Sequence, residues 1–473
     1  MSHDRARITF EGKTMECRAD TTVAVALWEN GIRHLSHSHK YGNHRGLTCA
    51  RGHCTACLMR VDGIPNVRTC ELPIQDGMKI EKQDAGAFYA PPMQKMLSIG
   101  GRLFPVGFYY KWFTKPVPVS RLFLDTIRPL TGVGRLPEKT HLPELPAAPE
   151  GDDPGTAPAT DLGRIDTLII GAGPAGLEQA LEASGQLLVV DDHAQPGGQR
   201  YLTLKELNGP DGPNLDRFPV LAAAWRKLDP LVQRFQAERG TDFRGGAKAI
   251  AGYAPSGILL KDQNTLLTAT FGRLVWSAGA LDTLGLFPGN DTPGLIGPRA
   301  LYRLLTRDGM DVQNKRVLLV GSGLDLWLSA AVLAHRGAVV SLVVTGSGWQ
   351  SEVSAAVDLG WQLTTGLQLA EVKPLGHNRI EAVFTPGRTS PGPADSQLRL
   401  QADFAVICQR GKPTYDIPYQ LGADMVNQPA RGGFTSPEPE VELSGGSTIA
   451  FHGEAAGLLP VDMATLSPTS EIP

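Results

Sequence analysis

The 473-residue sequence contains no run of eighteen apolar residues, so no segment is long enough to cross a membrane as a helix. It has no excess of basic residues: 45 Lys and Arg against 48 Asp and Glu give a net charge of −3, which does not favour nucleic-acid binding. Its charged amino terminus, M-S-H-D-R-A-R, leads directly into a strand pattern and lacks the features of a signal peptide. These absences predict a cytoplasmic protein with no nucleic acid among its partners and no membrane span.

Cysteine is also scarce, yet four of the six cysteines lie close together. Cys49, Cys54 and Cys57 are spaced C-x4-C-x2-C, and Cys70 follows after twelve further residues. This is the plant-type spacing of four thiolate ligands to a [2Fe-2S] cluster. The intervening V-D-G predicts a turn that brings the fourth cysteine back to the other three. We therefore interpret the four cysteines as cluster ligands.

Three alternatives to an iron–sulfur cluster are weaker. A structural zinc site more often has two C-x2-C pairs. Disulfides need an oxidising compartment, and four unliganded buried cysteines would share this spacing only by coincidence. Cys17 and Cys408 stand alone in apolar stretches and are expected to be core residues.

Five histidines crowd around the cysteine loop: His34, His37, His39, His44 and His53. A Rieske-type site would need two histidines in place of two cysteines, whereas all four cysteines are present. We therefore expect these histidines to be surface residues or to contact phosphate.

Residues 1–85 predict a small α+β domain. R-I-T-F-E-G-K-T-M-E-C-R alternates around Gly12 as a hairpin. T-T-V-A-V-A-L-W-E-N-G predicts a short helix, capped by Asp20 or Thr21 and ended by Gly31. The cysteine loop and a last strand, L-P-I-Q-D-G-M-K-I-E, follow. This order of elements predicts a ferredoxin-like β-grasp fold.

Residues 86–163 differ in composition from the rest of the chain. The segment F-P-V-G-F-Y-Y-K-W-F (104–113) has six aromatic residues in ten, and P-E-L-P-A-A-P-E-G-D-D-P-G-T-A-P-A-T is a linker rich in proline, alanine and acidic residues. The aromatic segment is either a satellite of the core or a partner surface, and its composition does not decide between them.

Residues 164–203 predict a dinucleotide-binding unit. A buried strand, R-I-D-T-L-I-I, runs into Gly171-x-Gly173-x-x-Gly176 and a helix, and a second strand ends at Asp191. Such glycines allow a tight turn, close approach to a pyrophosphate and close helix packing, while the helix N-terminus favours the anion. Asp191, or its neighbour Asp192, is expected to accept from a ribose hydroxyl.

The next motif, P-G-G-Q-R (196–200), completes a resemblance to the FAD-binding half of two-dinucleotide-domain flavoproteins. The resemblance implies that the Gly-Gly turn passes near the flavin and that S-A-G-A (277–280) lies against the FAD. In T-I-A-F-H-G-E-A-A-G (448–457), a glutamate stands where these proteins bring an aspartate to the ribityl chain. The expected FAD-contacting residues are Gly171, Gly173, Pro174, Ala175, Gly176, Asp191, Asp192, Gly198, Gln199, Arg200, Ala278, Gly279, Gly453 and Glu454.

Residues 315–345 repeat the order strand, glycines, helix and strand, around Gly321 and Gly323. The third glycine position is Leu326, and the second strand ends at Thr345, so the contacts expected for an NAD ribose are missing. Three interpretations of this segment stay open: a structural relic, an adenine-nucleotide site of the ADP or ATP type, or an NAD(P)H site. The chain has no C-x2-C between the two units, which excludes disulfide-reductase chemistry.

These patterns predict an α/β protein with a β-grasp [2Fe-2S] domain in front of two Rossmann-like units. The expected boundaries are residues 1–85 for the cluster domain, 86–163 for the aromatic segment and linker, 164–295 for the first part of the FAD-binding domain, 296–400 for the second, degraded Rossmann domain, and 401–473 for the return to the FAD-binding domain.

The whole order resembles the α subunits of heteromeric sarcosine oxidase, hydroxyproline and opine dehydrogenases and hydrogen cyanide synthase. The most specific matches are the cysteine loop, G-F-Y-Y-K-W-F (107–113), G-A-G-P-A-G (171–176), P-G-G-Q (196–199) and F-P-G-N-D-T-P-G (287–294). The resemblance implies partnership with a FAD-dependent, amine-oxidising β subunit, further small subunits, and an FMN that can sit between the chains.

Three hypotheses of function follow. The first is an electron-transfer subunit of a flavin and iron–sulfur dehydrogenase or oxidase acting on C–N bonds, with substrate and catalytic residues on the partner. The second is an NAD(P)H-dependent ferredoxin-type flavoprotein reductase, against which Leu326 and Thr345 argue. The third is an inert scaffold subunit, which the four cysteines disfavour.

Overall fold

The computed structural model describes residues 5–37, 43–83, 116–121, 159–210, 212–213, 215–262, 265–346, 349–376, 378–387 and 397–458. The aromatic segment 104–113 and most of the predicted linker lie outside these residues. None of the helices in the described ranges is long and apolar enough to cross a membrane.

The amino-terminal domain has the predicted β-grasp fold. Its five-stranded sheet has the order β2-β1-β7-β5-β6, with β1 antiparallel to β2 and parallel to β7. The V-D-G turn joins β5 to β6, with Asp62 and Gly63 both at positive φ, as a tight hairpin turn requires. The elements are β1 (Arg5–Phe10), β2 (Lys13–Arg18), α1 (Val23–Glu29), β3 (Ser36–His37), β4 (His44–Arg45), β5 (Leu58–Val61), β6 (Ile64–Arg68) and β7 (Lys79–Lys82).

The expected cap of α1 is wrong. The helix begins at Val23, after Thr22 and not after Asp20 or Thr21, and Thr22 makes no side-chain capping bond. The Thr21 hydroxyl instead donates to the backbone oxygen of Asp308, 3.1 Å away, in the second dinucleotide unit. A contact between domains thus replaces a local cap.

The first dinucleotide-binding unit is an eight-stranded sheet. Its parallel part has the order β10-β9-β8-β13-β27, and β13 continues into an antiparallel meander with β12 and β11. β8 begins inside the predicted linker. The elements are β8 (Thr160–Ile170), α5 (Pro174–Glu182), β9 (Leu187–Asp191), α6 (Gly198–Leu207), α7 (Pro219–Arg239), β10 (Phe243–Gly245), β11 (Ala247–Tyr253), β12 (Gly257–Asp262), β13 (Thr265–Trp276), β26 (Glu440–Glu442) and β27 (Thr448–Phe451).

The second unit repeats this plan. Its five parallel strands have the order β15-β22-β16-β17-β18, and an antiparallel sheet, β19-β20-β21, accompanies them. This repetition confirms the predicted pair of Rossmann-like units. The elements are β15 (Leu295–Ile296), α8 (Pro298–Thr306), β16 (Arg316–Gly321), α9 (Leu324–His335), β17 (Val339–Val344), α10 (Gln350–Asp358), β18 (Gln362–Thr365), β19 (Leu367–Leu375), β20 (Arg379–Pro386), β21 (Leu398–Ala402) and β22 (Phe404–Cys408).

Short elements connect the two units. β14 pairs with β23, and β24 pairs with β25. Their bounds, with those of the neighbouring helical turns, are β14 (Ala280–Leu281), β23 (Lys412–Pro413), α11 (Asp416–Gln420), β24 (Val426–Gln428), β25 (Gly433–Thr435) and a 3-10 turn, η6 (Gly453–Ala456).

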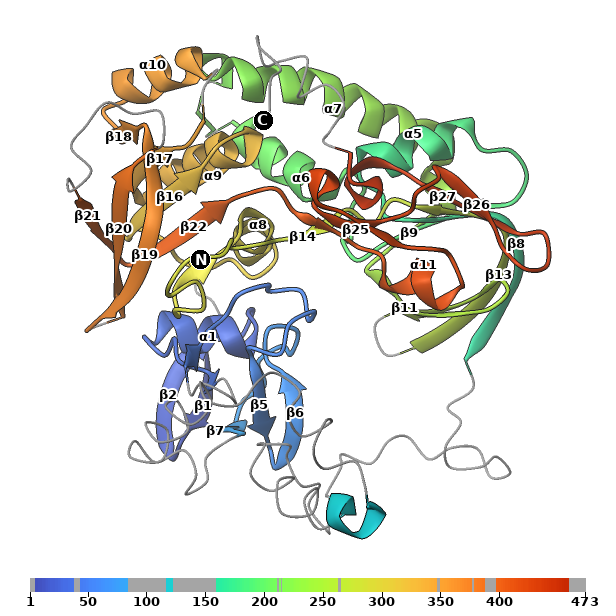
Figure 1. Cartoon of the computed structure of the whole chain (residues 1–473), viewed down its shortest axis with the longest axis horizontal. Coiled ribbons are helices and arrows are strands. Elements are labelled where there is room, and N and C mark those ends of the chain that lie inside the picture. Colours follow the sequence, from blue (N-terminus) through green and yellow to red (C-terminus); the bar gives the residue numbers. More distant parts are fainter. Residues whose placement is uncertain are drawn as a thin grey trace.

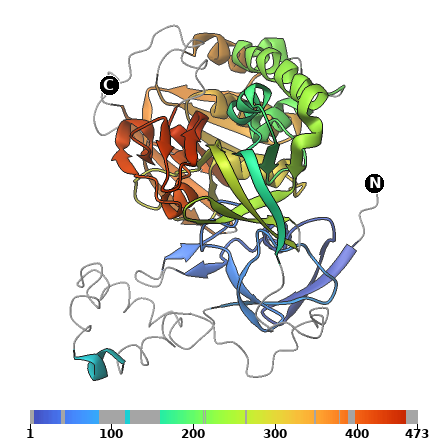
Figure 2. The same cartoon turned by 90° about the vertical axis from the view of Figure 1, so that its right-hand side faces the viewer.

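The cluster domain packs against the body formed by the two units. Figures 1 and 2 show it in blue below the body, with α1 facing α8. Trp28 of α1 contacts Phe404 of β22 edge to face, with ring centroids 5.8 Å apart. Arg18 donates to the backbone oxygen of Asp308 at 2.8 Å. The apolar residues of α1 and those around α8 and α9 belong to one buried cluster, so the domains share a core.

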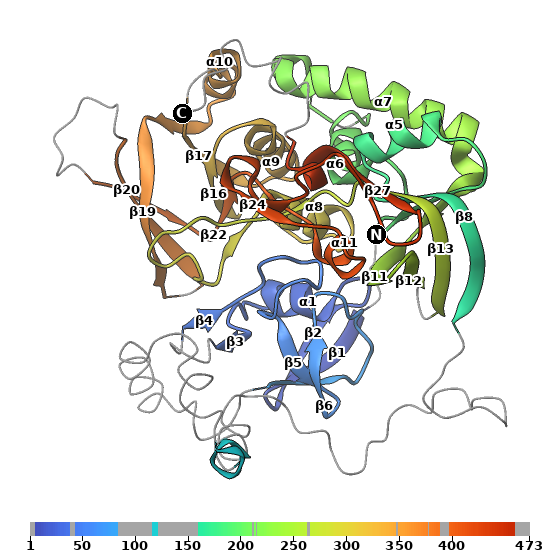
Figure 3. The ribbon, with the colours of Figure 1, turned by 45° about the vertical axis from the view of Figure 1, so that its right-hand side comes forward.

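α8 lies where the cluster domain meets the body (Figure 3). Arg299, Arg303 and Arg307 recur at every fourth position along this helix and its C-terminal end. Because residues four apart share one helical face, the three guanidinium groups form a row. The row runs from the first dinucleotide unit to the cysteine loop.

Candidate cofactor sites

The four cysteines of the loop converge as predicted. Cys57 and Cys70 are each 1% exposed, while Cys49 and Cys54 are partly buried. The backbone N–H of Cys54 donates to the Cys49 sulfur at 3.4 Å. The thiol of Cys49 is close enough to those of Cys54 and Cys70 to shift its pKa, and the same holds for Cys57 and Cys70. The fold therefore brings together all four sulfurs that the spacing selected.

The electrostatics of this group fit a cationic metal centre. Bonds from the Cys54 and Cys70 thiols lower the pKa of Cys49. The same contacts raise the pKa of Cys54 and of Cys70, because each faces a sulfur that already carries negative charge. Four buried thiolates cannot coexist here without positive charge between them, and iron supplies that charge. The residues fit a [2Fe-2S] cluster.

Backbone contacts hold the loop in shape. Thr69 donates its hydroxyl to the Cys57 backbone oxygen and Ser36 donates to that of Ala56, both at 2.8 Å. Arg307, from the end of α8, donates to the backbone oxygen of Cys70 at 2.9 Å. One cluster ligand is therefore held by a cation from the second dinucleotide unit.

The glycine loop between β8 and α5 is built for close approach. Gly171 has a φ of +106°, and a Cβ there would lie 2.3 Å from the backbone oxygen of Ser277. A Cβ at Gly176 would lie 1.9 Å from the oxygen of Gly171, so this glycine lets the helix pack against the strand. A Cβ at Gly173 would meet nothing within 4 Å. The space in front of Gly173 is thus free for a ligand.

A cavity of about 510 Å³ lies in front of this loop. Gln199 lines it, and its Nε2 is buried without a hydrogen-bond partner among the described residues, so a donor is left for a ligand. Gly176 does not line the cavity and acts only in packing. The other expected residues all line it: Gly171, Gly173, Pro174, Ala175, Asp191, Asp192, Gly198, Gln199, Arg200, Ala278, Gly279, Gly453 and Glu454.

The two expected ribose acids have different partners. Asp191 accepts from the backbone N–H of Ala172 at 2.7 Å and from that of His193 at 2.8 Å, so it also braces the glycine loop. Asp192 pairs with Arg303 of α8 at 2.8 Å. Although burial disfavours its charged form, its bonds with His193 and nearby arginines keep the pKa of Asp192 well below the usual value. Of the two, Asp191 is the better candidate for a ribose.

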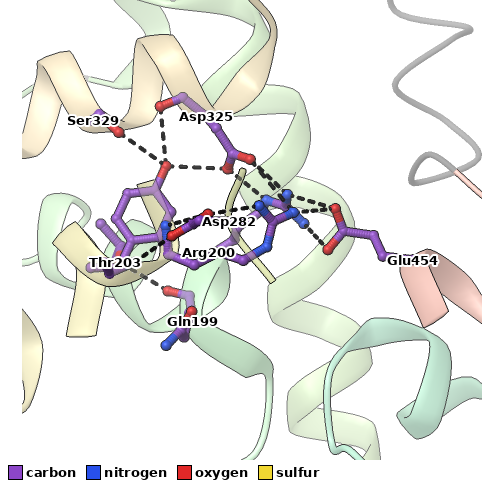
Figure 4. A network of polar contacts seen from close by, with 10 residues as sticks. Gln199, Arg200, Thr203, Asp282, Asp325, Ser329 and Glu454 are labelled. Carbon is purple, nitrogen blue, oxygen red and sulfur yellow. Dashed lines mark hydrogen bonds and ion pairs between the residues drawn. The ribbon is translucent and has the colours of Figure 1, made fainter. Parts of the chain in front are cut away.

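A network of charged side chains borders the first cavity, and Figure 4 shows how these side chains lie. Arg200 makes two bonds of 2.7 Å to Asp325 in the first turn of α9 and two of 3.0 and 3.1 Å to Glu454. Arg299 pairs with Glu454 and, at 3.1 Å, with Asp282. Although burial opposes charge, the two arginines lower the pKa of Glu454. The network ties both units to η6.

A second cavity of about 580 Å³ continues this groove beneath the cluster loop. It shares Gly171, Asp191 and Ala278 with the first cavity, so the two meet at the end of β8. Lys248 of β11 lines it, and burial lowers the pKa of this lysine. The glycine loop, where the diphosphate of a dinucleotide would bind, therefore lies where the two cavities meet.

Sequence reasoning missed several residues of this groove. Arg51, Lys248 and Arg299 line it but come from the cluster loop, the meander and α8. The only indication in the sequence was that the arginines of α8 are four residues apart, which places Arg299 and Arg303 on one face of the helix. Nothing in the sequence around Arg51 or Lys248 indicates that these two segments meet.

The prediction for the histidines needs correction. His37 is buried, and its ring lies 4.2 Å from that of His34 and 5.1 Å from that of His44. The three rings form one group at the domain surface, with His34 stacked on His44 and His37 edge-on to both, so only the buried His37 departs from the surface position expected. His53 lines the second cavity, and His39 lies outside the described residues. Cys17 and Cys408 are buried, as expected.

The second glycine motif lies apart from the groove. Neither Gly321 nor Gly323 lines the two cavities, although Leu324, which follows, lines the first. A Cβ at Gly321 would lie 2.0 Å from the backbone oxygen of Cys408, so this glycine serves packing. The first turn of α9 presents Asp325, already bound to Arg200. The expected residues of a second nucleotide site are therefore not part of this groove.

Comparison with known proteins agrees with this geometry. Residues 3–85 match the family model of the 2Fe-2S iron–sulfur cluster binding domain. The crystal structure of L-proline dehydrogenase from P. horikoshii has the same fold, with a TM-score of 0.55 at 17% identity over 96% of this chain and 69% of that one.

Curated relatives extend the likeness over most of the chain. The alpha subunit of sarcosine oxidase from Rhizobium meliloti is 26% identical over 86% of this chain, which spans 41% of that protein. The A subunit of opine oxidase from Agrobacterium tumefaciens is 31% identical over 38% of this chain and 36% of its own length. The HcnA subunit of hydrogen cyanide synthase from Pseudomonas aeruginosa is 32% identical over 16% of this chain and 72% of its own length. The chain thus belongs to the family that contains the sarcosine oxidase α subunits, the opine oxidase A chain and HcnA of hydrogen cyanide synthase, with the [2Fe-2S] domain fused in front of the flavoprotein-like units.

Proposed function

We propose that this chain is the electron-transfer subunit of a multi-subunit flavin and iron–sulfur dehydrogenase or oxidase that oxidises a C–N bond of an amine, imino acid or opine. Amine oxidation takes place on a FAD-dependent β subunit. Each of the three curated relatives is named as one subunit of an enzyme, which supports the need for partners. The chain spans 41% of the length of its R. meliloti relative.

One observation carries this proposal: the cysteine loop and the glycine loop lie in one packed body. Arg51, between Cys49 and Cys54, lines the groove in front of Gly171. The two candidate redox sites therefore border the same groove, which supports a role as an electron carrier.

In this proposal the groove binds FAD, with its diphosphate at Gly171 and Gly173 and its ribose at Asp191. When bound, the two cofactors supply the electron-accepting and electron-donating chemistry. The chain's own residues orient the dinucleotide through the glycine loop, the Gln199 amide and Arg200. The thiolates of the cysteine loop fix the cluster and determine, with their surroundings, how readily it accepts an electron.

The test is the cofactor content and amine reactivity of the purified chain. Anaerobic purification should give two iron atoms and one non-covalent FAD per chain, and the reduced protein should show a rhombic EPR signal. The chain alone should oxidise neither sarcosine nor proline. Background iron would refute the cluster, and turnover of an amine by the isolated chain would place the catalytic site here and refute the assignment.

A further inference from the structure

Arg51 is a cluster-loop residue that lines both cavities of the groove. Its side chain is 16% exposed, and its Nε is buried without a hydrogen-bond partner in the described part of the chain. The carboxylate of Asp192 lies 3.8 Å from its Nη2, beyond hydrogen-bond distance. A buried guanidinium whose donor lacks a hydrogen-bond partner destabilises the folded protein unless an anion accepts from it. Arg51 therefore suits an anionic ligand.

The cluster loop forms one wall of the groove. Arg51, Gly52 and His53 line the second cavity together with Lys248 of β11. The Lys248 ammonium donates to the backbone oxygen of Arg51 at 2.9 Å, which fastens the loop to the first dinucleotide unit. Two neighbouring cationic residues, Arg51 and Lys248, thus line the second cavity. The groove has this shape only while the loop keeps its conformation.

That conformation depends on the cysteines beside Arg51. Ala50 and Gly52 both have positive φ, at 48° and 70°, and Ala50 carries a side chain that disfavours this region. With a cluster bound, Cys49 and Cys54 anchor the two ends of this strained turn. Without it, the four crowded thiols have no cation to hold them together. Loss of the cluster therefore releases the turn that carries Arg51.

We propose that the cluster loop is part of the dinucleotide site: Arg51 donates to the diphosphate of the bound dinucleotide, and the loaded cluster holds Arg51 in place. This inference rests on the proposed function, which puts a dinucleotide in the groove. Cluster loading and FAD binding then strengthen each other, because coupling between two sites is reciprocal. A chain that lacks one of the two cofactors therefore binds the other less tightly.

The rival role for Arg51 is docking only, with the guanidinium paired to Asp192 to hold the two domains together. The two roles differ in what FAD affinity depends on. A docking residue changes the stability of the domain contact and leaves FAD affinity unchanged as long as the chain stays folded. A ligand residue changes FAD affinity while the cluster spectrum stays intact.

The experiment measures the dissociation constant of FAD on the full chain by the recovery of flavin fluorescence on dilution. Arg51→Met keeps the length and apolar stem of the side chain and should weaken FAD binding about tenfold, with Arg51→Lys in between. The matched control is Arg60→Met on β5. The guanidinium of Arg60 pairs with Glu81 at a distance of 3.6 Å, and Arg60 does not line the groove. That control should bind FAD as the wild type does.

The second arm removes the cluster from the wild-type chain with an iron chelator, so that the result does not depend on how any variant folds. FAD affinity should fall at least tenfold, and saturating FAD should slow cluster loss several-fold. An FAD affinity within twofold of the untreated chain, with Arg51→Met equal to Arg60→Met, would overturn the inference. Absence of FAD binding by every form, wild type included, would instead refute the proposed function of the groove.

Discussion

Gly173 and Gly176 belong to one sequence motif but differ in what surrounds them. A side chain at Gly176 would collide with the Gly171 oxygen inside the protein, whereas a side chain at Gly173 would enter only the open groove. Gly173 also has a φ of −73°, which any residue adopts. Gly176 is therefore needed for folding, whereas Gly173 is needed only for ligand binding.

Gly173→Val is expected to leave the fold intact and to empty the FAD site, because the valine methyl groups would lie where the diphosphate must sit. Flavin released by heating should drop to background, while the cluster absorbance and the melting temperature stay near wild type. Gly240→Val is a suitable control, since Gly240 is equally open and has a φ of −58°. Unchanged flavin content in Gly173→Val would show that the flavin binds elsewhere.

His193 makes the stability of the first unit depend on pH. Although burial favours the neutral ring, hydrogen bonds to Asp191 and Asp192 raise the pKa of His193 to about 9. An unfolded histidine has a pKa of about 6.5. The stabilising contribution is therefore complete below pH 6.5 and is lost as the pH rises from 6.5 through 9.

We expect this contribution to be about 3 kcal/mol, from a shift of roughly two and a half pKa units at 1.36 kcal/mol each. Chemical denaturation of the wild type at pH 6 and at pH 9.5 measures it, and His193→Gln should remove most of the difference. A His193→Gln variant that loses as much stability as the wild type over this range would contradict the assignment to His193.

At the scale of elements, α8 connects the two candidate cofactor sites. Its arginines pair in turn with Glu454 at the cavity end, with Asp192 near the ribose position and, through Arg307, with the Cys70 backbone. A positive charge and a hydrogen bond next to a ligand stabilise the reduced cluster, which carries one more negative charge. The row of arginines therefore favours reduction of the cluster.

Arg307→Gln is expected to lower the midpoint potential of the cluster by tens of millivolts, given that a tenfold change in a one-electron equilibrium is about 59 mV. A redox titration followed by EPR measures the shift. Arg336→Gln breaks a comparable ion pair, Arg336 to Glu206 at 2.7 Å, outside the cluster domain, and should leave the potential unchanged. Equal potentials in the two variants would count against a role for α8 in tuning.

The second Rossmann-like unit leads to a negative prediction. Its glycine motif lacks the third glycine, and Asp325 in the first turn of α9 puts a carboxylate where a nicotinamide dinucleotide would place phosphate. NADH and NADPH should therefore not reduce the flavin of the purified chain, although an adenine nucleotide can still occupy the unit without turnover. Rapid flavin bleaching in a stopped-flow experiment with NADH would favour a reductase instead.

Local patterns were enough to predict the elements, but not the contacts between them. Cysteine spacing, the V-D-G turn and the strand–glycine–helix order each depend on neighbours in the sequence, and the structure contains all three. The predicted helix cap, Asp20 or Thr21, was wrong: the helix begins after Thr22, and the Thr21 hydroxyl donates to the distant backbone oxygen of Asp308. Arg51 and Lys248 are 197 positions apart, so no local pattern could bring them together.

At the scale of the whole molecule, a cluster domain is packed against two dinucleotide-binding units. The domains share a buried core around α1, α8 and α9, so the cluster site and the groove keep a fixed relation. In the proposed complex, electrons enter from an amine-oxidising partner and pass through centres that this chain holds. The chain itself has no need to contact the amine.

EPR of the cluster after anaerobic mixing with an amine tests this claim most directly. Sarcosine, proline and an opine are added to the chain alone and to the chain co-expressed with a FAD-dependent amine-oxidising partner, and samples are frozen within one turnover. The account predicts a reduced [2Fe-2S] signal only in the complex, with at least one of these amines, and none in the chain alone. A reduced cluster in the isolated chain, or an oxidised cluster in a complex that turns over amine, would contradict it.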